Sequence, residues 1–346
     1  ARSFWEQVLR LIFAALRWAA GAGTLGLIIA HLASLTVTAA GSARLLSRYY
    51  GLDLLFPTGG DKASRRARFM AGGSVLPANI IGRLSGDAPP VVINFWIPGA
   101  AGAVAAGLYG IARKLSSIPQ LVRMAFSYVM GPLASAQARH DRGEIQHLFA
   151  FATRLSVMLV LPLGTALLLS GDLLLKLFAP GAEVAWPMLA ALTIARVIEA
   201  VCGPANAVQR VIGHLKWPVL NSLVGLVAAS IITVVLLPTL HATGVAIGVG
   251  TGLVLTASLS YYQLTHSDGL NAFVPPFARI ALVSVAGSVL VAIMAVVGGL
   301  FLPDIVQGVI NLAMLALAWW ICLRFGLTEA DRKAISRDRK KAPKNS

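Results

Sequence analysis

The chain has 346 residues, of which 57% are hydrophobic and only 12% are charged, and its net charge is +15. Soluble domains are about 45–50% apolar and about 25% charged, so this composition excludes an ordinary soluble protein, which would need a larger polar surface. The apolar residues fall into runs of about 18–25, the length that crosses a hydrocarbon core roughly 30 Å thick. The sequence therefore predicts an all-α polytopic membrane protein.

About ten transmembrane helices are predicted along the chain. The first two share one long apolar run, and Gly21 and Gly23 are expected to form the turn between them. The third and fourth are longer than a bilayer requires, which predicts tilt or protruding ends. The predicted spans cover residues 4–22, 24–46, 68–97, 101–135, 147–170, 184–210, 216–238, 241–265, 277–300 and 304–325.

Lys and Arg gather in every second connection between these spans. Residues 44–68, 136–146, 210–216 and the tail from Arg324 onward are all basic, whereas the alternate connections carry few basic residues apart from Lys176. The positive-inside rule then places the basic connections and both ends of the chain in the cytoplasm. Topology and contact with anionic lipid account for the net positive charge, so membrane lipids are expected partners and nucleic acid is not.

The fourth predicted span carries cations at mid-membrane. Arg113 lies about 12 residues, or roughly 18 Å, from the outer end of this span. A charge near the bilayer centre costs about 2.5–3.5 kcal/mol on insertion scales and usually marks a functional site. Lys114 lies at the margin of a polar stripe at helical spacing, and neither cation has a carboxylate in its own helix. The stripe consists of Arg113, Ser116, Ser117, Gln120, Arg123 and Ser127.

Three other spans carry polar stripes at a similar depth. They consist of Arg10 and Arg17 in the first span, Asn79, Arg83, Asp87 and Asn94 in the third, and Arg196, Glu199, Gly203, Asn206 and Arg210 in the sixth. Arg83 with Asp87 could form an ion pair within one helix, and so could Arg196 with Glu199; such pairs could be purely structural.

The polar stripes of these spans are predicted to face one water-filled cavity with a positive potential. Such a cavity suits an anionic substrate, and phosphate groups are the obvious candidates. The candidate substrate-binding residues are Arg113, Lys114, Arg83, Asp87, Arg196, Glu199, Arg17, Arg123, Gln120 and Asn79.

Patterns that would indicate catalysis or a cofactor are missing from the sequence. No P-loop is present, no nucleophile and base are arranged as in hydrolases, and Cys202 and Cys322 have no Cys or His neighbours at metal-ligand spacing. We therefore expect no catalytic residue, metal or cofactor. Gly244, Gly248 and Gly252 form a tandem small-residue motif that predicts close helix packing. Prolines within spans predict tolerated bends, at Pro77, Pro90, Pro119, Pro162 and Pro204.

The run Tyr109-Gly-Ile-Ala-Arg-Lys-Leu, with Pro119 and Pro132 after it, resembles a known family. It is similar to the polysaccharide-repeat flippases, and to the related lipid II flippases, of the multidrug/oligosaccharidyl-lipid/polysaccharide exporter (MOP) superfamily. Pro77 with Asp87, and the segments 152–178 and 237–250, extend the resemblance over most of the chain.

The resemblance implies a fold of two six-helix lobes and two extra helices that works by alternating access. This chain would begin at the fifth of fourteen spans and lack the first four. The domains would then be a remnant of the N-terminal lobe with a basic loop at 1–60, the C-terminal lobe at 61–270, the extra two-helix hairpin at 271–326 and a basic cytoplasmic tail at 327–346.

The implied function is translocation of an undecaprenyl-pyrophosphate-linked oligosaccharide across the bacterial inner membrane. The repeat unit would belong to an O-antigen, capsule or exopolysaccharide, and a polysaccharide polymerase and glycosyltransferases are further candidate partners. Lys114 falls where lipid II flippases place a functionally important arginine. Arg113 occupies a position that is acidic there, which favours the polysaccharide-repeat branch.

Three other functions compete with this prediction. A cation-coupled multidrug exporter of the same fold would favour acidic residues in its cavity. A non-catalytic membrane component of a polysaccharide assembly complex would need no cavity. A membrane glycosyltransferase, ligase or polymerase would need a sizeable outward loop, and every predicted outward loop is short, so the protein is not expected to be an enzyme.

Overall fold

The structure is a computed structural model that describes residues 24–50, 80–82, 84–122, 124, 142–214 and 216–327, with Val8 and Ile12. The chain divides into two compact units, Ala1–Gly73 and Ser74–Ser346. The described residues form helices and no strand, and five of these helices are long and apolar enough to cross a membrane. This confirms the predicted all-α, polytopic membrane fold.

The described part of the first unit is helix α2, Thr24–Tyr50. It covers the second predicted span and continues past it, so Arg44 and Arg48 lie exposed on the helix and not in the predicted loop. The hydroxyl of Thr36 donates to the Leu32 carbonyl at 2.9 Å, one turn earlier in the helix. Such back-bonding lets a polar side chain sit on an apolar helix.

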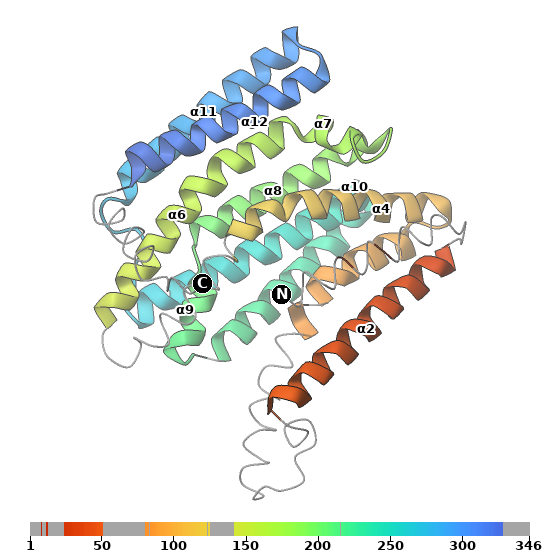
Figure 1. The fold of residues 1–346 in the computed structure, drawn as a ribbon, viewed down its shortest axis with the longest axis horizontal. Helices are drawn as coiled ribbons and strands as arrows, with labels where there is room; N and C mark the ends of the chain where they lie inside the picture. The colour runs from red at the N-terminus through yellow and green to blue at the C-terminus, as the bar shows by residue number, and fades with distance from the viewer. Residues whose placement is uncertain are drawn as a thin grey trace, which may run out of the picture. The chain divides into compact units, whose positions relative to one another are not determined.

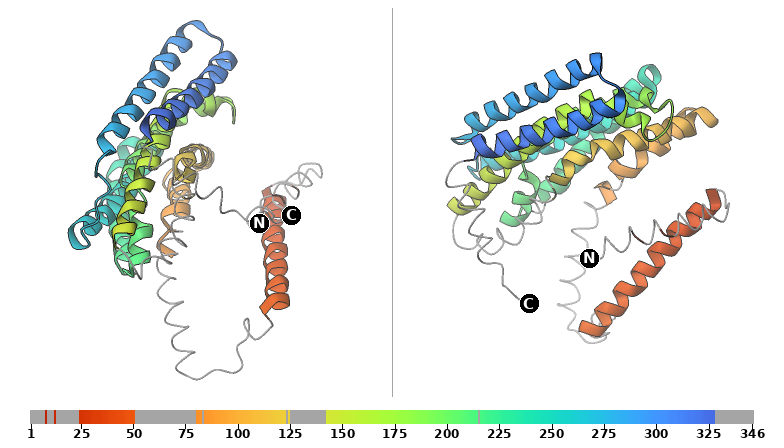
Figure 2. Two further views of the ribbon diagram at one scale, coloured as in Figure 1. Left: turned by 60° about the vertical axis from the view of Figure 1, so that its left-hand side comes forward. Right: turned by 45° about the horizontal axis from the view of Figure 1, so that its top comes forward.

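The second unit is a helix bundle in which α6 lies between α8 and a hairpin of α11 and α12 (Figure 1). Helices α11 and α12 also lie side by side in the two views of Figure 2. On its other side α8 packs against α10 and α4, and a helical segment at residues 84–96 precedes α4. The elements are α4 Ala100–Ser116, α6 Arg142–Leu169, α7 Gly171–Lys176, η2 Ala182–Ala185, α8 Trp186–Val201, α9 Ala205–Ile212, α10 Lys216–Ser267, α11 Phe277–Phe301, α12 Asp304–Ile321 and η3 Cys322–Gly326.

Helix α10 is a hairpin of two arms, which correspond to the predicted spans 216–238 and 241–265. The chain reverses at His241, whose φ of 47° and ψ of −129° are not helical. The arms touch along small residues: a Cβ at Gly248 would lie 2.2 Å from the Thr233 hydroxyl, and one at Gly252 would lie 2.5 Å from the Gly225 carbonyl oxygen. The predicted close packing at this glycine motif is confirmed.

The predicted continuous span at 184–210 is wrong, because the helix breaks between α8 and α9. Gly203 has a φ of 64°, a conformation that glycine adopts without steric cost, and Pro204 has no backbone N–H to continue the helix. A Cβ at Gly203 would lie 2.1 Å from the Thr153 hydroxyl of α6. The Gly-Pro pair therefore fixes both the break and the close approach of α6.

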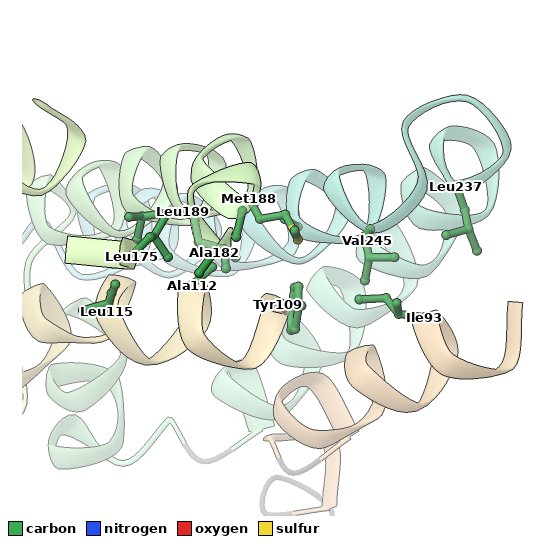
Figure 3. Close-up of a cluster of buried hydrophobic side chains, with 14 residues drawn as sticks. Ile93, Tyr109, Ala112, Leu115, Leu175, Ala182, Met188, Leu189, Leu237 and Val245 are labelled. Carbon is green, nitrogen blue, oxygen red and sulfur yellow. The ribbon is translucent and has the colours of Figure 1, made fainter. Parts of the chain in front are cut away.

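A buried apolar cluster joins α4 to α8, α10 and segment 84–96 (Figure 3). Tyr109 of α4 lies near Ile93 of the preceding segment and Val245 of α10, with Met188 of α8 in the same cluster. Lipid is as apolar as these side chains, so van der Waals packing and not exclusion from water holds such helices together in a membrane. The cluster sets the positions of the four elements that carry the candidate site.

A buried network of amide side chains links α9 to both arms of α10. Asn221 donates to the Gln263 side-chain oxygen at 2.7 Å and accepts from the Gln263 amide at 2.9 Å. Asn221 also donates to the Ser260 hydroxyl at 3.0 Å, and Gln209 of α9 donates to Gln263 at 2.8 Å. Hydrogen bonds of this kind fix the register of helices within a membrane.

We expect Asn221→Leu to lower the free energy of unfolding by about 1–2 kcal/mol, because the half-buried amide of Gln263 loses both of its hydrogen bonds to the buried Asn221. Thermal melting of the purified protein in detergent measures the change. Ser230→Ala is the matched control, since Ser230 is exposed and its hydroxyl donates only to the Leu226 carbonyl of its own arm. A melting temperature equal to that of the control would show that the network does not stabilise the hairpin.

Two side-chain hydrogen bonds anchor α12 to the α6–α7 region. The Asn311 amide donates to the Ser170 hydroxyl at 2.8 Å, and the Trp319 indole donates to the Leu159 carbonyl at 3.0 Å. Leu159 lies in the turn before Pro162, the proline inside α6. The α11–α12 hairpin is therefore attached to the bundle at two depths.

Candidate functional site

The second unit contains a cavity of about 730 Å³. Its walls come from residues 81, 82, 84–89 and 92, from α4 and the residues after it, from α8, from Asn206 at the start of α9 and from both arms of α10. The described charged residues in these walls are Asp87, Arg113, Lys114, Arg196 and Glu199.

Six of the ten predicted site residues line this one cavity, namely Asp87, Arg113, Lys114, Gln120, Arg196 and Glu199. Polar stripes from separate helices therefore meet at one cavity within the described residues. The other four predicted residues, Arg17, Asn79, Arg83 and Arg123, lie outside the described residues. A role in binding substrate stays a prediction for all ten.

Helix α4 presents its cations to the cavity because its other face is anchored. Tyr109, Ala112 and Leu115 are buried in the apolar cluster, which leaves Arg113 half-buried and Lys114 exposed. The helix turns at Ser117 and resumes over residues 118–122. This turn brings Gln120 to the same wall.

Arg113 pairs with Asp87 of the preceding helical segment, at 3.6 Å between Nη1 and Oδ1. The two side chains are 39% and 64% exposed, and a long, exposed pair of this kind contributes little to stability. A Cβ at Gly86 would lie 2.7 Å from the Arg113 guanidinium, so the glycine makes room for it. Arg83 lies outside the described residues, so the predicted Arg83–Asp87 pair stays a prediction; the structure shows that the Asp87 carboxylate reaches Arg113 of the following helix.

Arg196 and Glu199 form the tighter pair, as their spacing in the sequence predicts. Arg196 Nη1 donates to Glu199 Oε2 at 2.8 Å, and the side chains are only 15% and 9% exposed. Removing one residue of this pair leaves the charge of the other nearly buried and without its counter-ion. The resulting loss of stability is far larger than for an ion pair at a surface.

Lys114 differs from both arginines. It lines the cavity, it is exposed, and no ion pair to it is found among the residues that the structure describes. The described charged lining therefore consists of three cations and two carboxylates, an excess of one positive charge. Lys114 and the loosely paired Arg113 are the described cations of this lining that are most accessible to an anion.

The wall formed by α10 was not predicted from the sequence. The described α10 residues that line it carry no charge. Seven are small or hydroxyl-bearing, namely Ser222, Gly225, Ala229, Ser230, Thr233, Gly252 and Thr256, and the others are Leu226, Val234, Val245, Val249 and Leu253. The Ser222 hydroxyl donates to the Pro218 carbonyl at 2.7 Å and that of Thr256 to the Gly252 carbonyl at 2.8 Å. Their oxygens keep lone pairs and can still accept hydrogen bonds. The sequence feature that could have predicted this wall is the helical spacing of small residues within an apolar span.

The two walls are chemically complementary. Arg113, Lys114 and Arg196 offer charge-assisted donors on one side, which suits a phosphate, and the α10 wall offers hydroxyl acceptors on the other, which suits a sugar. No group of three or more His, Cys, Asp or Glu side chains that could hold a metal ion is found in the part of the chain that the structure describes.

Among solved structures, the chain is similar to the lipid II flippase MurJ in its inward closed conformation, with a TM-score of 0.59 and 14% sequence identity. The likeness covers 92% of this chain and 65% of that one, so this chain spans less than two thirds of the length of MurJ. No protein-family profile and no curated protein sequence matches the chain. The likeness shows that this chain shares the fold of that protein; the flippase function and the polysaccharide-repeat branch stay predictions.

Proposed function

We propose that this protein is a flippase that carries an undecaprenyl-pyrophosphate-linked oligosaccharide across the bacterial inner membrane by alternating access. One observation carries the proposal: cations from two helices, Arg113 and Lys114 of α4 and Arg196 of α8, converge on one cavity of a membrane-embedded bundle. Charges within a membrane are costly and are kept where they serve a pathway or a substrate. A pyrophosphate group matches these cations in charge and geometry.

The fold and the second wall support the same proposal. The solved neighbour is named for flipping lipid II, a lipid-linked precursor. The α10 wall adds hydroxyl acceptors that suit sugars, so the repeat unit of an O-antigen, capsule or exopolysaccharide is our choice of substrate. The protein would act without a catalytic residue, with both chain ends in the cytoplasm, and would receive its substrate from glycosyltransferases and pass it to a polysaccharide polymerase.

The charge balance separates this function from drug export. A cavity that binds cationic drugs should carry excess negative charge, whereas the described lining of this cavity carries excess positive charge. The net positive lining therefore favours an anionic substrate over a multidrug exporter of the same fold.

Transport by the purified protein in liposomes tests the proposal. The probe is a fluorescent, short-chain polyprenyl-pyrophosphate-linked sugar, and an impermeant reductant that quenches only the outer leaflet reports its movement. We expect the protein to flip this probe faster than a fluorescent polyprenol-linked sugar without phosphate, because only the former engages the cations. Equal rates for the two probes, or rates equal to those of protein-free liposomes, would contradict the proposal.

A further inference from the structure

We infer that Glu199 is an internal counter-ion that occupies the substrate's place on Arg196 and is displaced when an anionic substrate binds. The inference rests on the proposed function and adds to it a device for releasing the substrate. It assigns to Glu199 a role in setting how tightly the cavity holds a pyrophosphate and how fast it lets go.

The geometry of the Arg196–Glu199 pair is the starting point. Both residues line the cavity, and the carboxylate lies 2.8 Å from the guanidinium Nη1. A guanidinium binds carboxylate and phosphate through the same planar fork of N–H donors. A phosphate that engages this edge of Arg196 must therefore displace Glu199, and Glu199 must displace the phosphate when the pair forms again.

The charges around the pair leave this competition intact. The other described charged groups of the cavity lining are Asp87, Arg113 and Lys114, and the described α10 lining has none. Tyr109 of α4 and Cys202, which directly follows α8, are close enough to interact electrostatically with the pair. The buried Arg154 lies on α6, which also packs against α8. Glu199 therefore lies in a described lining that has more cations than carboxylates, and it accepts a hydrogen bond from Arg196 at 2.8 Å.

The three cations of the cavity form a graded series. Lys114 has no ion pair among the described residues, Arg113 is loosely paired at 3.6 Å, and Arg196 is tightly paired at 2.8 Å. An anion can therefore bind at Lys114 without breaking an ion pair, whereas it engages the paired edge of Arg196 only by displacing Glu199. When the Arg196–Glu199 pair forms again, the carboxylate speeds release of the anion. A transport site must bind its cargo strongly enough to load it and weakly enough to unload it.

The experiment compares wild-type protein with Glu199→Gln in lipid nanodiscs, using farnesyl pyrophosphate as the charged probe and farnesol as the uncharged one. We expect the variant to bind farnesyl pyrophosphate on the order of tenfold more tightly, within the usual range of coupling between two ligands, through slower dissociation. Farnesol binding should not change. In the liposome assay, the KM for the fluorescent probe and the maximal rate should both fall, because loading improves and release slows.

Two further variants make the result decisive. Glu199→Asp shortens the side chain by one methylene and keeps its charge, so its affinity for farnesyl pyrophosphate should rise by less than that of Glu199→Gln. It replaces Glu199→Gln in the experiment if that variant does not fold. Asp172→Asn, at an exposed carboxylate of α7 outside the cavity lining, should bind as wild type does.

The outcomes separate this inference from the proposed function. A folded Glu199 variant that binds farnesyl pyrophosphate with unchanged or lower affinity would overturn the inference, because Glu199 would then only position Arg196. Wild-type protein that binds farnesyl pyrophosphate no better than farnesol would overturn the proposed function, and the inference with it.

Discussion

Replacing both Arg113 and Lys114 with alanine should abolish transport while leaving membrane insertion and expression close to wild type. The change removes the two most accessible cations of the cavity and turns its described charge excess from positive to negative. A hydrogen bond to a charged group is worth about 1.5–3 kcal/mol, so two such losses weaken pyrophosphate binding by roughly a hundredfold or more. Asp87 is 64% exposed, so losing Arg113 does not strand a buried charge.

Transport of the fluorescent pyrophosphate-linked probe, at matched amounts of folded protein, measures the effect. Lys114→Ala alone should be less severe, and Lys114→Arg should keep much of the activity, since phosphate accepts either cation in a different geometry. Lys176→Ala is the matched control, because Lys176 is an exposed cation outside the cavity lining that pairs with Asp304 at 3.7 Å. A double variant that transports at the wild-type rate would refute the cationic-cavity mechanism.

Gly252→Val should prevent the α10 hairpin from closing and leave little folded protein. The first added carbon would lie 2.5 Å from the Gly225 carbonyl oxygen and 2.9 Å from the Ala229 Cβ of the facing arm. Overpacking of this kind typically costs about 1–3 kcal/mol or more, and parting the arms also breaks the Asn221–Gln263 bonds. Because the backbone is what the side chain meets, the arms must move apart as a whole.

Fluorescence-detected gel filtration and melting of the detergent-solubilised protein would measure the loss. Gly110→Ala in α4 is the control, since a Cβ at Gly110 meets nothing within 4 Å, and alanine should stabilise that helix by about 0.5–1 kcal/mol. If the Gly252 variant elutes and melts like the control, the two arms do not touch in the way that the structure indicates.

The polar stripes could be predicted because helical spacing is a local property. The residues Arg113 and Lys114 of α4 line the cavity as their positions within one helix predict, and the i,i+3 spacing of Arg196 and Glu199 brings them within 2.8 Å. A charge in an apolar span is costly to insert, so these side chains stand out in the sequence alone. The all-α membrane fold followed from the same apolar runs.

The remaining features depend on contacts between distant parts of the chain. The Asp87–Arg113 pair requires two helices to pack in one particular register, which no spacing within either helix specifies. The α10 wall includes neutral residues such as Ser222 and Thr233. Placing such residues in an apolar span costs little free energy, so they do not stand out in the sequence as a binding site. The positive φ of Gly203 and its close approach to Thr153 of α6 are visible only in the structure, so Pro204 in the sequence could indicate a bend but not a complete interruption.

The ion pair between Asp87 and Arg113 also bears on how the protein is made. As part of the predicted span 101–135, α4 would reach the insertion channel during synthesis with two adjacent cations, each of which costs about 2.5–3.5 kcal/mol at the bilayer centre. The helical segment 84–96, with Asp87, is synthesised just before it and is still nearby. Neutralisation of Arg113 by Asp87 would let the two segments leave the channel together as a hairpin. The charges that this cavity needs would then be tolerable during biogenesis because their counter-ion is encoded one helix upstream.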